Sequence, residues 1–143
     1  MKNILFLCTG NSCRSVLAES YMQHAGAGKW SAFSAGAAPT GTVHPLALQT
    51  LEELGFPHQG FSSKSWDVFA TNEWKMDVIV TVCDNAAGEA CPVWLGHPAT
   101  HHWPFPDPAS FTGTLEECRA HFRDVFEMIR VRIDEFLRLS EDT

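Results

Sequence analysis

The sequence predicts an α/β fold in which a four-stranded parallel sheet carries helices on both faces, giving three layers. Two continuous apolar runs, at 3–7 and 77–82, are typical of strands buried on both sides. Amphipathic segments between and after these runs indicate helices. Strands that alternate with helices favour parallel pairing. No repeat or linker divides the 143 residues, so we expect a single domain over 1–143.

The first half of the chain contains two predicted strands and two predicted helices. The first strand runs into a glycine-containing turn, and a helix over 15–25 follows and ends before Gly26. A short strand is expected over 29–34. Pro45 begins the next helix and Gly55 ends it, because proline favours the first helical position and glycine the position after the last. One face of this helix is formed by Ala47, Thr50, Leu51 and Leu54.

The second half begins with the strand over 77–82, and a weaker strand is expected over 99–103. Thr114 and Glu117 form a T-x-x-E capping box at the start of the last helix, in which each residue satisfies a backbone N–H of the other. The residues expected on the buried face recur at three- and four-residue steps and are Leu115, Cys118, Phe122, Val125, Phe126, Ile129, Ile133 and Phe136.

The composition argues against several classes of function. The net charge is −7 and no cluster of basic residues precedes the last helix, so nucleic acid is not an expected partner. No apolar run approaches the roughly 18 residues that a membrane span needs. The start of the chain does not resemble a signal peptide, so we expect a cytoplasmic protein. Five cysteines then indicate catalytic or redox thiols, because structural disulfides are rare in the cytoplasm.

The segment between the first strand and the first helix has the residues of an oxyanion-binding loop. Five residues separate Cys8 from Arg14, and their N–H groups can surround a tetrahedral anion together with the helix N-terminus. Arg14 can bind two anion oxygens, and the same field stabilises the Cys8 thiolate as a nucleophile. Gly10 is expected to allow unusual dihedral angles and close approach, and Asn11 to tolerate a left-handed backbone and brace the loop. The predicted loop comprises Thr9, Gly10, Asn11, Ser12, Cys13, Arg14 and Ser15.

The alternative interpretation of this segment is a buried structural cysteine and a surface arginine in an ordinary strand–helix turn. A bare C-x5-R pattern is common by chance. Here the pattern follows a strand directly and contains Gly10 and Asn11. It ends in Ser15 at the start of a helix, where the hydroxyl can donate a hydrogen bond to the Cys8 sulfur. That context favours the functional interpretation.

The residues CTGNSCRS at 8–15 and FSAG at 33–36 resemble the low-molecular-weight protein tyrosine phosphatases and the arsenate reductases that share their fold. The similarity extends from Lys2 to the last helix. It implies a low-molecular-weight phosphatase-like fold and an enzyme that attacks a phosphate-like oxyanion with Cys8. The loop does not by itself separate the two branches of the family.

Two further cysteines, Cys83 and Cys91, distinguish a reductase from a phosphatase. Cys83 follows the strand over 77–82, whose carboxyl end shares a sheet edge with that of the first strand. A phosphatase needs one thiol, whereas thiols that reduce arsenate must end as a disulfide, and a third thiol can pass that disulfide to a partner. The alternatives are a small buried side chain for Cys83 and a surface thiol for Cys91. Their joint presence beside this loop favours a relay.

The segment around these cysteines resembles the redox segment of thioredoxin-coupled arsenate reductases, with one departure. Seven residues lie between Cys83 and Cys91, one more than in the members that it resembles. The resemblance implies thioredoxin as the electron donor, and the departure leaves a glutathione/glutaredoxin system open. No tightly bound cofactor is expected.

The resemblance also implies that Asp107 protonates the departing oxygen, which is otherwise a poor leaving group. The alternative is an aspartate that only shapes a turn. Phosphatases of this family usually follow the Asp-Pro pair with tyrosines that embrace an aromatic substrate. This chain has Ala109 and Ser110, and its one tyrosine is Tyr21. We therefore predict reduction of arsenate to arsenite for arsenic detoxification. A tyrosine phosphatase is the alternative, and a non-catalytic anion-binding or redox-sensing module is a third hypothesis.

No metal is predicted. The histidines at 97, 101 and 102 lack the framework of a zinc site. Some family members bind potassium through positions like Asn11, Glu19 and Ser34, but Lys64 can supply a positive charge there instead. The two remaining cysteines receive no role in the mechanism, because Cys118 is expected in the core and Cys13 is not needed.

Overall fold

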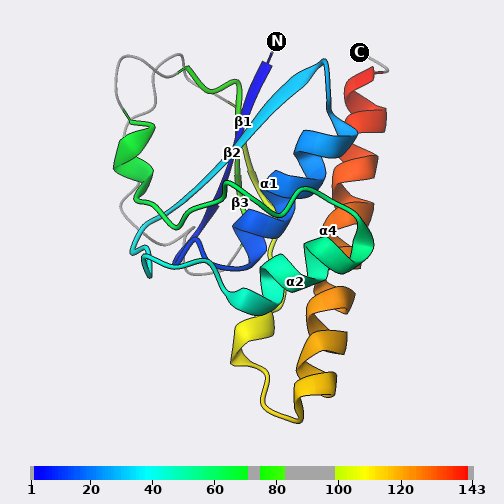
Figure 1. Ribbon diagram of the computed structural model, residues 1–143. Coiled ribbons are helices and arrows are strands. Elements are labelled where there is room, and N and C mark those ends of the chain that lie inside the picture. Colours follow the sequence, from blue (N-terminus) through cyan, green and yellow to red (C-terminus); the bar gives the residue numbers. More distant parts are fainter. Residues whose placement is uncertain (1, 71–74, 83–98, 142–143) are drawn as a thin grey trace.

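The computed structural model describes residues 2–70, 75–82 and 99–141 (Figure 1). The elements follow in the order β1 (Lys2–Cys8), α1 (Arg14–Ala25), β2 (Trp30–Gly36), α2 (Pro45–Leu54), the 3-10 helix η1 (Trp66–Val68), β3 (Val78–Thr81), β4 (Ala99–His102), the 3-10 helix η2 (Pro108–Ser110) and α4 (Leu115–Glu141).

The predicted four-stranded parallel sheet is confirmed. Its strand order is β2-β1-β3-β4, and every neighbouring pair is parallel. In the register, Cys8 pairs with Gly36 of β2, and Leu7 pairs with Thr81 of β3. Because parallel strands all end on one side, the carboxyl ends of β1, β2 and β3 lie at the same edge of the sheet.

The side chains of β1 alternate between two apolar clusters, one on each face of the sheet. Ile4 and Phe6 pack with residues of α1 and α4, whereas Leu5 and Leu7 pack with residues around η1. These four side chains are fully buried, and burial of each stabilises the fold by about 1.5–3 kcal/mol. The continuous apolar run of the sequence therefore reflects a central strand covered on both sides.

The three α-helices lie on one face of the sheet and pack against one another (Figure 1). On the opposite face, the helical element among the described residues is η1, whose Trp66 packs beside Phe69 and Met76 against Leu5 and Leu7. Both faces of the sheet are therefore covered, as predicted. On the face opposite the α-helices, the short 3-10 helix η1 is the helical element among the described residues. Within the described residues, no helix is long and apolar enough to cross a membrane.

The ends of α2 match the sequence signals. Pro45 occupies the first helical turn, and Gly55 follows the helix with a φ of 82°, the left-handed conformation that glycine adopts at low cost. Ala47, Thr50 and Leu51 are buried as predicted. Leu54 was expected on the same face but is 39% exposed, because it lies in the last turn, where the helix leaves the core.

Helix α4 has the predicted capping box. Thr114 Oγ1 accepts a hydrogen bond from Glu117 N (3.1 Å), and Glu117 Oε1 accepts one from Thr114 N (3.2 Å). Of the residues expected on the apolar face, five are buried and Phe136 is partly buried; the five are Phe122, Val125, Phe126, Ile129 and Ile133.

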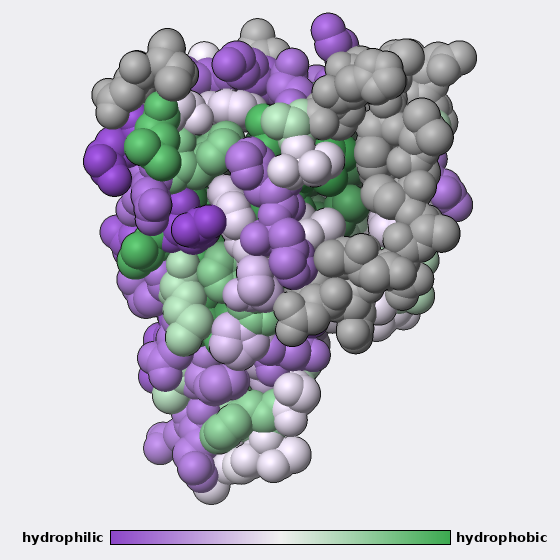
Figure 2. Space-filling view, turned by 180° about the vertical axis from the view of Figure 1, so that it is seen from behind, coloured by the Kyte–Doolittle hydropathy of each residue, from purple (hydrophilic) through white to green (hydrophobic). Residues whose placement is uncertain are grey.

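The expected burial of Leu115 and Cys118 is wrong. Leu115 is 65% exposed, and Cys118 is only half-buried. The first turns of α4 extend beyond the carboxyl ends of the strands (Figure 1), so the sheet offers these side chains no partner surface. From behind, the molecule tapers at this end and shows apolar surface near the tip (Figure 2).

We expect Thr114→Ala to lower the free energy of unfolding by about 1 kcal/mol, because it removes the hydroxyl that accepts from Glu117 N. Urea denaturation followed by circular dichroism measures this difference. Thr112→Ala, in the exposed loop before α4, is the matched control and should change the free energy by less than about 0.5 kcal/mol. Equal losses in the two variants would contradict a stabilising role for the capping box.

Candidate active site

The loop between β1 and α1 lies at the carboxyl edge of the sheet. Cys8 is the last residue of β1 and only 4% exposed, and Arg14 is the first residue of α1. Among the described residues, no side-chain bond caps the N-terminus of α1 at Cys13. The helix therefore directs its free N–H groups and its partial positive charge toward the loop that holds Cys8, as an anion site requires.

Asn11 braces the loop from inside the protein. It is fully buried, and its φ of 47° confirms the predicted left-handed backbone. Its side-chain Nδ2 donates to Ser15 Oγ (2.8 Å) and to Ser34 Oγ (3.0 Å). Its Oδ1 accepts from the backbone N of Lys64 (2.9 Å). One amide thus ties the loop to α1, to β2 and to the segment that precedes η1.

The two glycines around the loop allow close approach rather than unusual dihedral angles. Gly10 does not have a positive φ, so its expected unusual dihedral angles are not present, whereas its expected close approach is confirmed. Asn11 has the left-handed backbone, as predicted. A Cβ on Gly10 would lie 3.1 Å from Cγ2 of Thr40. A Cβ on Gly36 would lie 2.6 Å from the Thr9 carbonyl oxygen and 3.0 Å from Asn11 N. The FSAG segment therefore ends in a glycine because the loop backbone packs directly on it.

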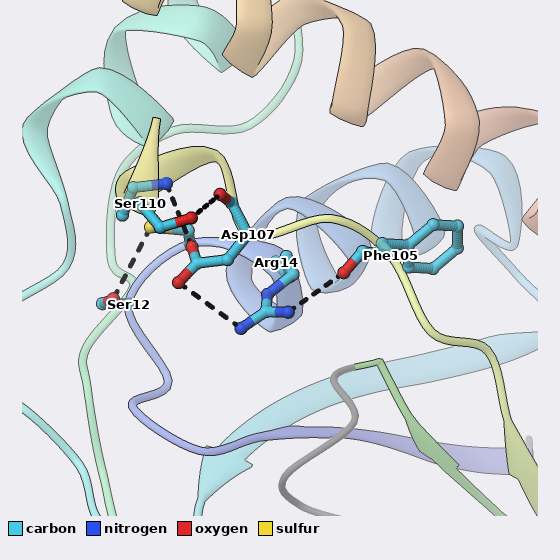
Figure 3. Close-up of polar contacts among 7 residues, drawn as sticks. Ser12, Arg14, Phe105, Asp107 and Ser110 are labelled. Carbon is cyan, nitrogen blue, oxygen red and sulfur yellow. Dashed lines mark hydrogen bonds and ion pairs between the residues drawn. The ribbon is translucent and has the colours of Figure 1, made fainter. Parts of the chain in front are cut away.

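Arg14 is held at the loop by two neighbours from the chain that follows β4 (Figure 3). Its Nη1 donates to the carbonyl oxygen of Phe105 (3.0 Å), and its Nη2 lies 3.8 Å from Oδ2 of Asp107. Its Nε is buried and has no hydrogen-bond partner among the residues that the structure describes. A buried guanidinium N–H without a partner is costly, and an oxyanion in the loop would satisfy it.

Asp107 faces Arg14 and also shapes the turn that holds it (Figure 3). It is the N-cap of η2, where its Oδ1 accepts from Ala109 N (3.0 Å). Ser110 Oγ donates to its carbonyl oxygen (2.8 Å). The other carboxylate oxygen, Oδ2, is directed toward Arg14, and the side chain is 41% exposed. The turn-forming and functional interpretations of Asp107 are therefore compatible.

The second cysteine of the loop differs from Cys8 in its chemistry. Burial raises the pKa of the Cys13 thiol to about 11, an effect that the nearby Asp107 charge reinforces and that a contact with Ser12 and the Arg14 charge oppose. Cys13 is therefore a neutral thiol at neutral pH and a poor nucleophile.

An acid and a base lie close together beneath the loop. Burial raises the pKa of Glu19, while a hydrogen bond from Ser34 and the charge of Lys64 oppose the rise. Burial lowers the pKa of Lys64, and the charge of Glu19 opposes that change. In both groups the effect of burial on the pKa outweighs that of the opposite charge.

The predicted relay residues Cys83 and Cys91 lie outside the described residues, as does His97. The chain that leads to Cys83 is described: Val82 N donates to the Leu7 carbonyl oxygen (2.8 Å), beside the start of the loop. His101 and His102 lie on β4, and within the described part of the chain no cluster of three or more histidine, cysteine or acidic residues could hold a metal ion.

Sequence reasoning missed three contributors to this site. They are the Phe105 carbonyl, which fixes Arg14, and Thr40 and Ser63, which contact the Gly10 carbonyl. Phe105 and Thr40 contribute backbone groups, for which residue identity carries no signal. Ser63 contributes its side chain, but it contacts a residue 53 positions away in the sequence.

Comparison with known proteins identifies relatives over nearly the whole chain. The model of the low molecular weight phosphotyrosine protein phosphatase family matches residues 3–142. An arsenate reductase of Shouchella clausii is 37% identical over 140 residues, which cover 98% of each chain. An arsenate reductase of Bacillus subtilis is 38% identical over 135 residues, which cover 94% of each chain.

Solved structures agree with this relationship. A structure described as an arsenate reductase in the phosphate binding state has a TM-score of 0.73 and 30% identity, and the match covers 96% of this chain and 98% of that one. The thioredoxin-dependent arsenate reductase of Corynebacterium glutamicum shares the fold, with a TM-score of 0.68 and 24% identity; the match covers 98% of this chain and 63% of that one.

We expect Gly36→Ala to weaken phosphate binding at least tenfold, because the new Cβ would displace the backbone of Thr9 and Asn11. Isothermal titration calorimetry with inorganic phosphate measures the effect. Gly28→Ala is the control: it strains a residue with a φ of 85° but has open space around its Cβ. It should lower stability while leaving phosphate affinity unchanged. Equal affinity in Gly36→Ala and the unaltered protein would show that the loop does not depend on this packing.

Proposed function

We propose that Cys8, Cys83 and Cys91 form the thiol relay of this chain, which belongs to the low-molecular-weight phosphotyrosine protein phosphatase family. Within that family it is a thiol-dependent arsenate reductase. The observation that supports capture of the oxyanion is the meeting of four features at one sheet edge. These are the Cys8 thiol, the Asp107 carboxyl, and, as far as the described residues go, an uncapped N-terminus of α1 and a buried guanidinium N–H without a partner.

The first step is capture of arsenate and attack by Cys8. The loop N–H groups and Arg14 hold the oxyanion oxygens, and their field favours the Cys8 thiolate. The Cys8 sulfur forms a bond to arsenic as an As–O bond breaks. Asp107 gives its proton to the departing oxygen, which leaves as water. This role for Asp107 is supported by its position beside the loop, where Oδ2 lies 3.8 Å from Nη2 of Arg14 and does not bond the turn, while Oδ1 accepts from Ala109 N.

The second step transfers two electrons to arsenic. The Cys83 thiolate attacks the Cys8 sulfur, an S–S bond forms, and the S–As bond breaks with its electron pair moving to arsenic. Arsenite is released, and the two thiols supply the electrons by becoming a disulfide. Cys91 then attacks Cys83, which frees Cys8 and leaves a Cys83–Cys91 disulfide. The approach of Cys83 is supported by the bond from Val82 N, in the preceding residue, to the Leu7 carbonyl.

An external thiol system must reduce the final disulfide. We propose thioredoxin as the donor, with glutathione/glutaredoxin as the alternative. A cycle that ends in a disulfide on every turnover requires a reducing compartment, and this supports action in the cytoplasm. Phosphate, which has the same shape and charge as arsenate, should occupy the same loop.

The cysteine variants test the relay. With thioredoxin, thioredoxin reductase and NADPH, we expect Cys83→Ser to produce no arsenite, because nothing removes arsenic from Cys8. Cys91→Ser should release about one arsenite per protein molecule and stop at a Cys8–Cys83 disulfide. Cys118→Ser, in the first turns of α4, is the control and should retain steady turnover.

The same assay is repeated with glutaredoxin and glutathione in place of the thioredoxin system. The system that gives the higher rate of arsenite formation is the electron donor. Steady arsenite formation by Cys83→Ser would contradict the relay, because a thiol other than Cys83 would then have to attack Cys8.

The acid role of Asp107 has a separate test. We expect Asp107→Asn to lower kcat for arsenate reduction by roughly 100-fold or more, because the amide cannot supply the proton. The asparagine oxygen can still accept from Ala109 N, so the turn should remain intact. Asp67→Asn, at an exposed aspartate of η1, is the matched control. A kcat for Asp107→Asn within twofold of the unaltered protein would exclude the acid role.

A further inference from the structure

A segment that follows β2 runs alongside the oxyanion-binding loop and bonds to its outer side. We name residues 38–44 the strap; it leads from β2 into α2 in Figure 1. Three backbone N–H groups of the strap donate to three carbonyls of the loop. The bonds run from Ala38 N to Thr9 O (2.9 Å), from Thr40 N to Gly10 O (3.0 Å) and from His44 N to Ser12 O (3.0 Å).

Ser63 adds a fourth bond at the middle of this contact. Its hydroxyl donates to the Gly10 carbonyl (2.8 Å), so this oxygen accepts from both Ser63 and Thr40. The same hydroxyl oxygen accepts from the backbone N of Gly41 (3.1 Å). Ser63 therefore fixes the carbonyl and the tip of the strap at once.

The position of Ser63 is itself fixed by its neighbour Lys64. The carbonyl of Lys64 accepts from Gly36 N at the end of β2 (2.9 Å), and its backbone N donates to Asn11 Oδ1 (2.9 Å). Ser63 thus contacts the loop from a segment that is bonded to the sheet, and its hydroxyl holds the Gly10 carbonyl in place.

The geometry of the peptide bond gives these contacts a consequence inside the loop. A trans peptide is planar, and its C=O and the following N–H point in opposite directions. When the strap holds a carbonyl on the outer side, the N–H of the next residue points away from the strap. The three carbonyls therefore set the directions of the N–H groups of Gly10, Asn11 and Cys13.

We propose that the strap and Ser63 aim these three N–H groups at the bound oxyanion, and that Ser63 is a positioning residue for the reaction. The inference rests on the proposed capture of an oxyanion by the loop, but not on the thiol relay. The orientation of the Gly10–Asn11 peptide depends most on such bonds, because glycine restricts the backbone least and Asn11 occupies a sparsely populated conformation. Its carbonyl receives two donors, from Thr40 N and from the Ser63 hydroxyl.

The test compares Ser63→Ala with Ser62→Ala, a neighbouring exposed serine. Isothermal titration calorimetry with inorganic phosphate should show affinity three- to tenfold weaker for Ser63→Ala, the effect of one lost hydrogen bond, and unchanged affinity for Ser62→Ala. The rate of Cys8 alkylation is followed by peptide mass spectrometry over a series of pH values. In Ser63→Ala the rise of this rate with pH should occur at higher pH, because the misaligned N–H groups stabilise the thiolate less. Ser63→Thr, which keeps the hydroxyl, should restore both properties.

Unchanged phosphate affinity and an unchanged alkylation profile in Ser63→Ala would overturn the proposal. Equal weakening in Ser62→Ala, or no recovery in Ser63→Thr, would also overturn it, because the effect would then not belong to the hydroxyl. Phosphate binding and arsenite formation by the unaltered protein distinguish a failure of this inference from a failure of the proposed function. If phosphate binds but no arsenite forms with either donor system, the relay fails while the role of Ser63 stands. If phosphate does not bind, oxyanion capture itself fails.

Discussion

The central place of β1 is the constraint on which the rest of the structure depends. Its side chains are buried on both faces, so the strand has one register between β2 and β3, and that register sets Cys8 opposite Gly36. A shift by one residue would turn every β1 side chain to the other face. It would also place a side chain of β2 where the loop backbone now packs on a glycine. The burial that stabilises the fold therefore also fixes the base of the active-site loop.

The loop keeps its shape because the polar groups beneath it are buried and satisfied. Asn11, Ser15 and Ser34 are fully buried and share hydrogen bonds. Loss of one partner would leave another buried group unpaired, at about 1–3 kcal/mol, so alternative loop conformations are expensive. Glu19 extends this network, because its carboxylate accepts a hydrogen bond from the Ser34 hydroxyl. The backbone donors that we propose for an oxyanion are thus oriented before it binds, which is the condition for electrostatic catalysis.

Sequence patterns predicted the parts of this structure that depend on local chemistry. The two apolar runs, the capped ends of α2 and α4, and the left-handed Asn11 all follow from properties of single residues or short spacings. The patterns failed where the answer depends on distant segments. The periodicity of α4 does not reveal where the sheet ends, so Leu115 was assigned to the core. The bond from Ser63 to Gly10 spans 53 positions and leaves no local pattern.

The fold also explains how one loop can serve both hydrolysis and reduction. In the proposed mechanism, capture of a tetrahedral oxyanion depends on Cys8, Arg14 and backbone donors, and none of these distinguishes phosphate from arsenate. Reduction needs additional thiols, and a parallel sheet offers a place for them, because neighbouring strands end side by side. Val82 already bonds to Leu7 at that edge. In the proposed relay, the cysteine directly after Val82 adds the second thiol that reduction needs. Cys13 lies within the loop itself but cannot substitute for such a cysteine, because burial keeps it protonated.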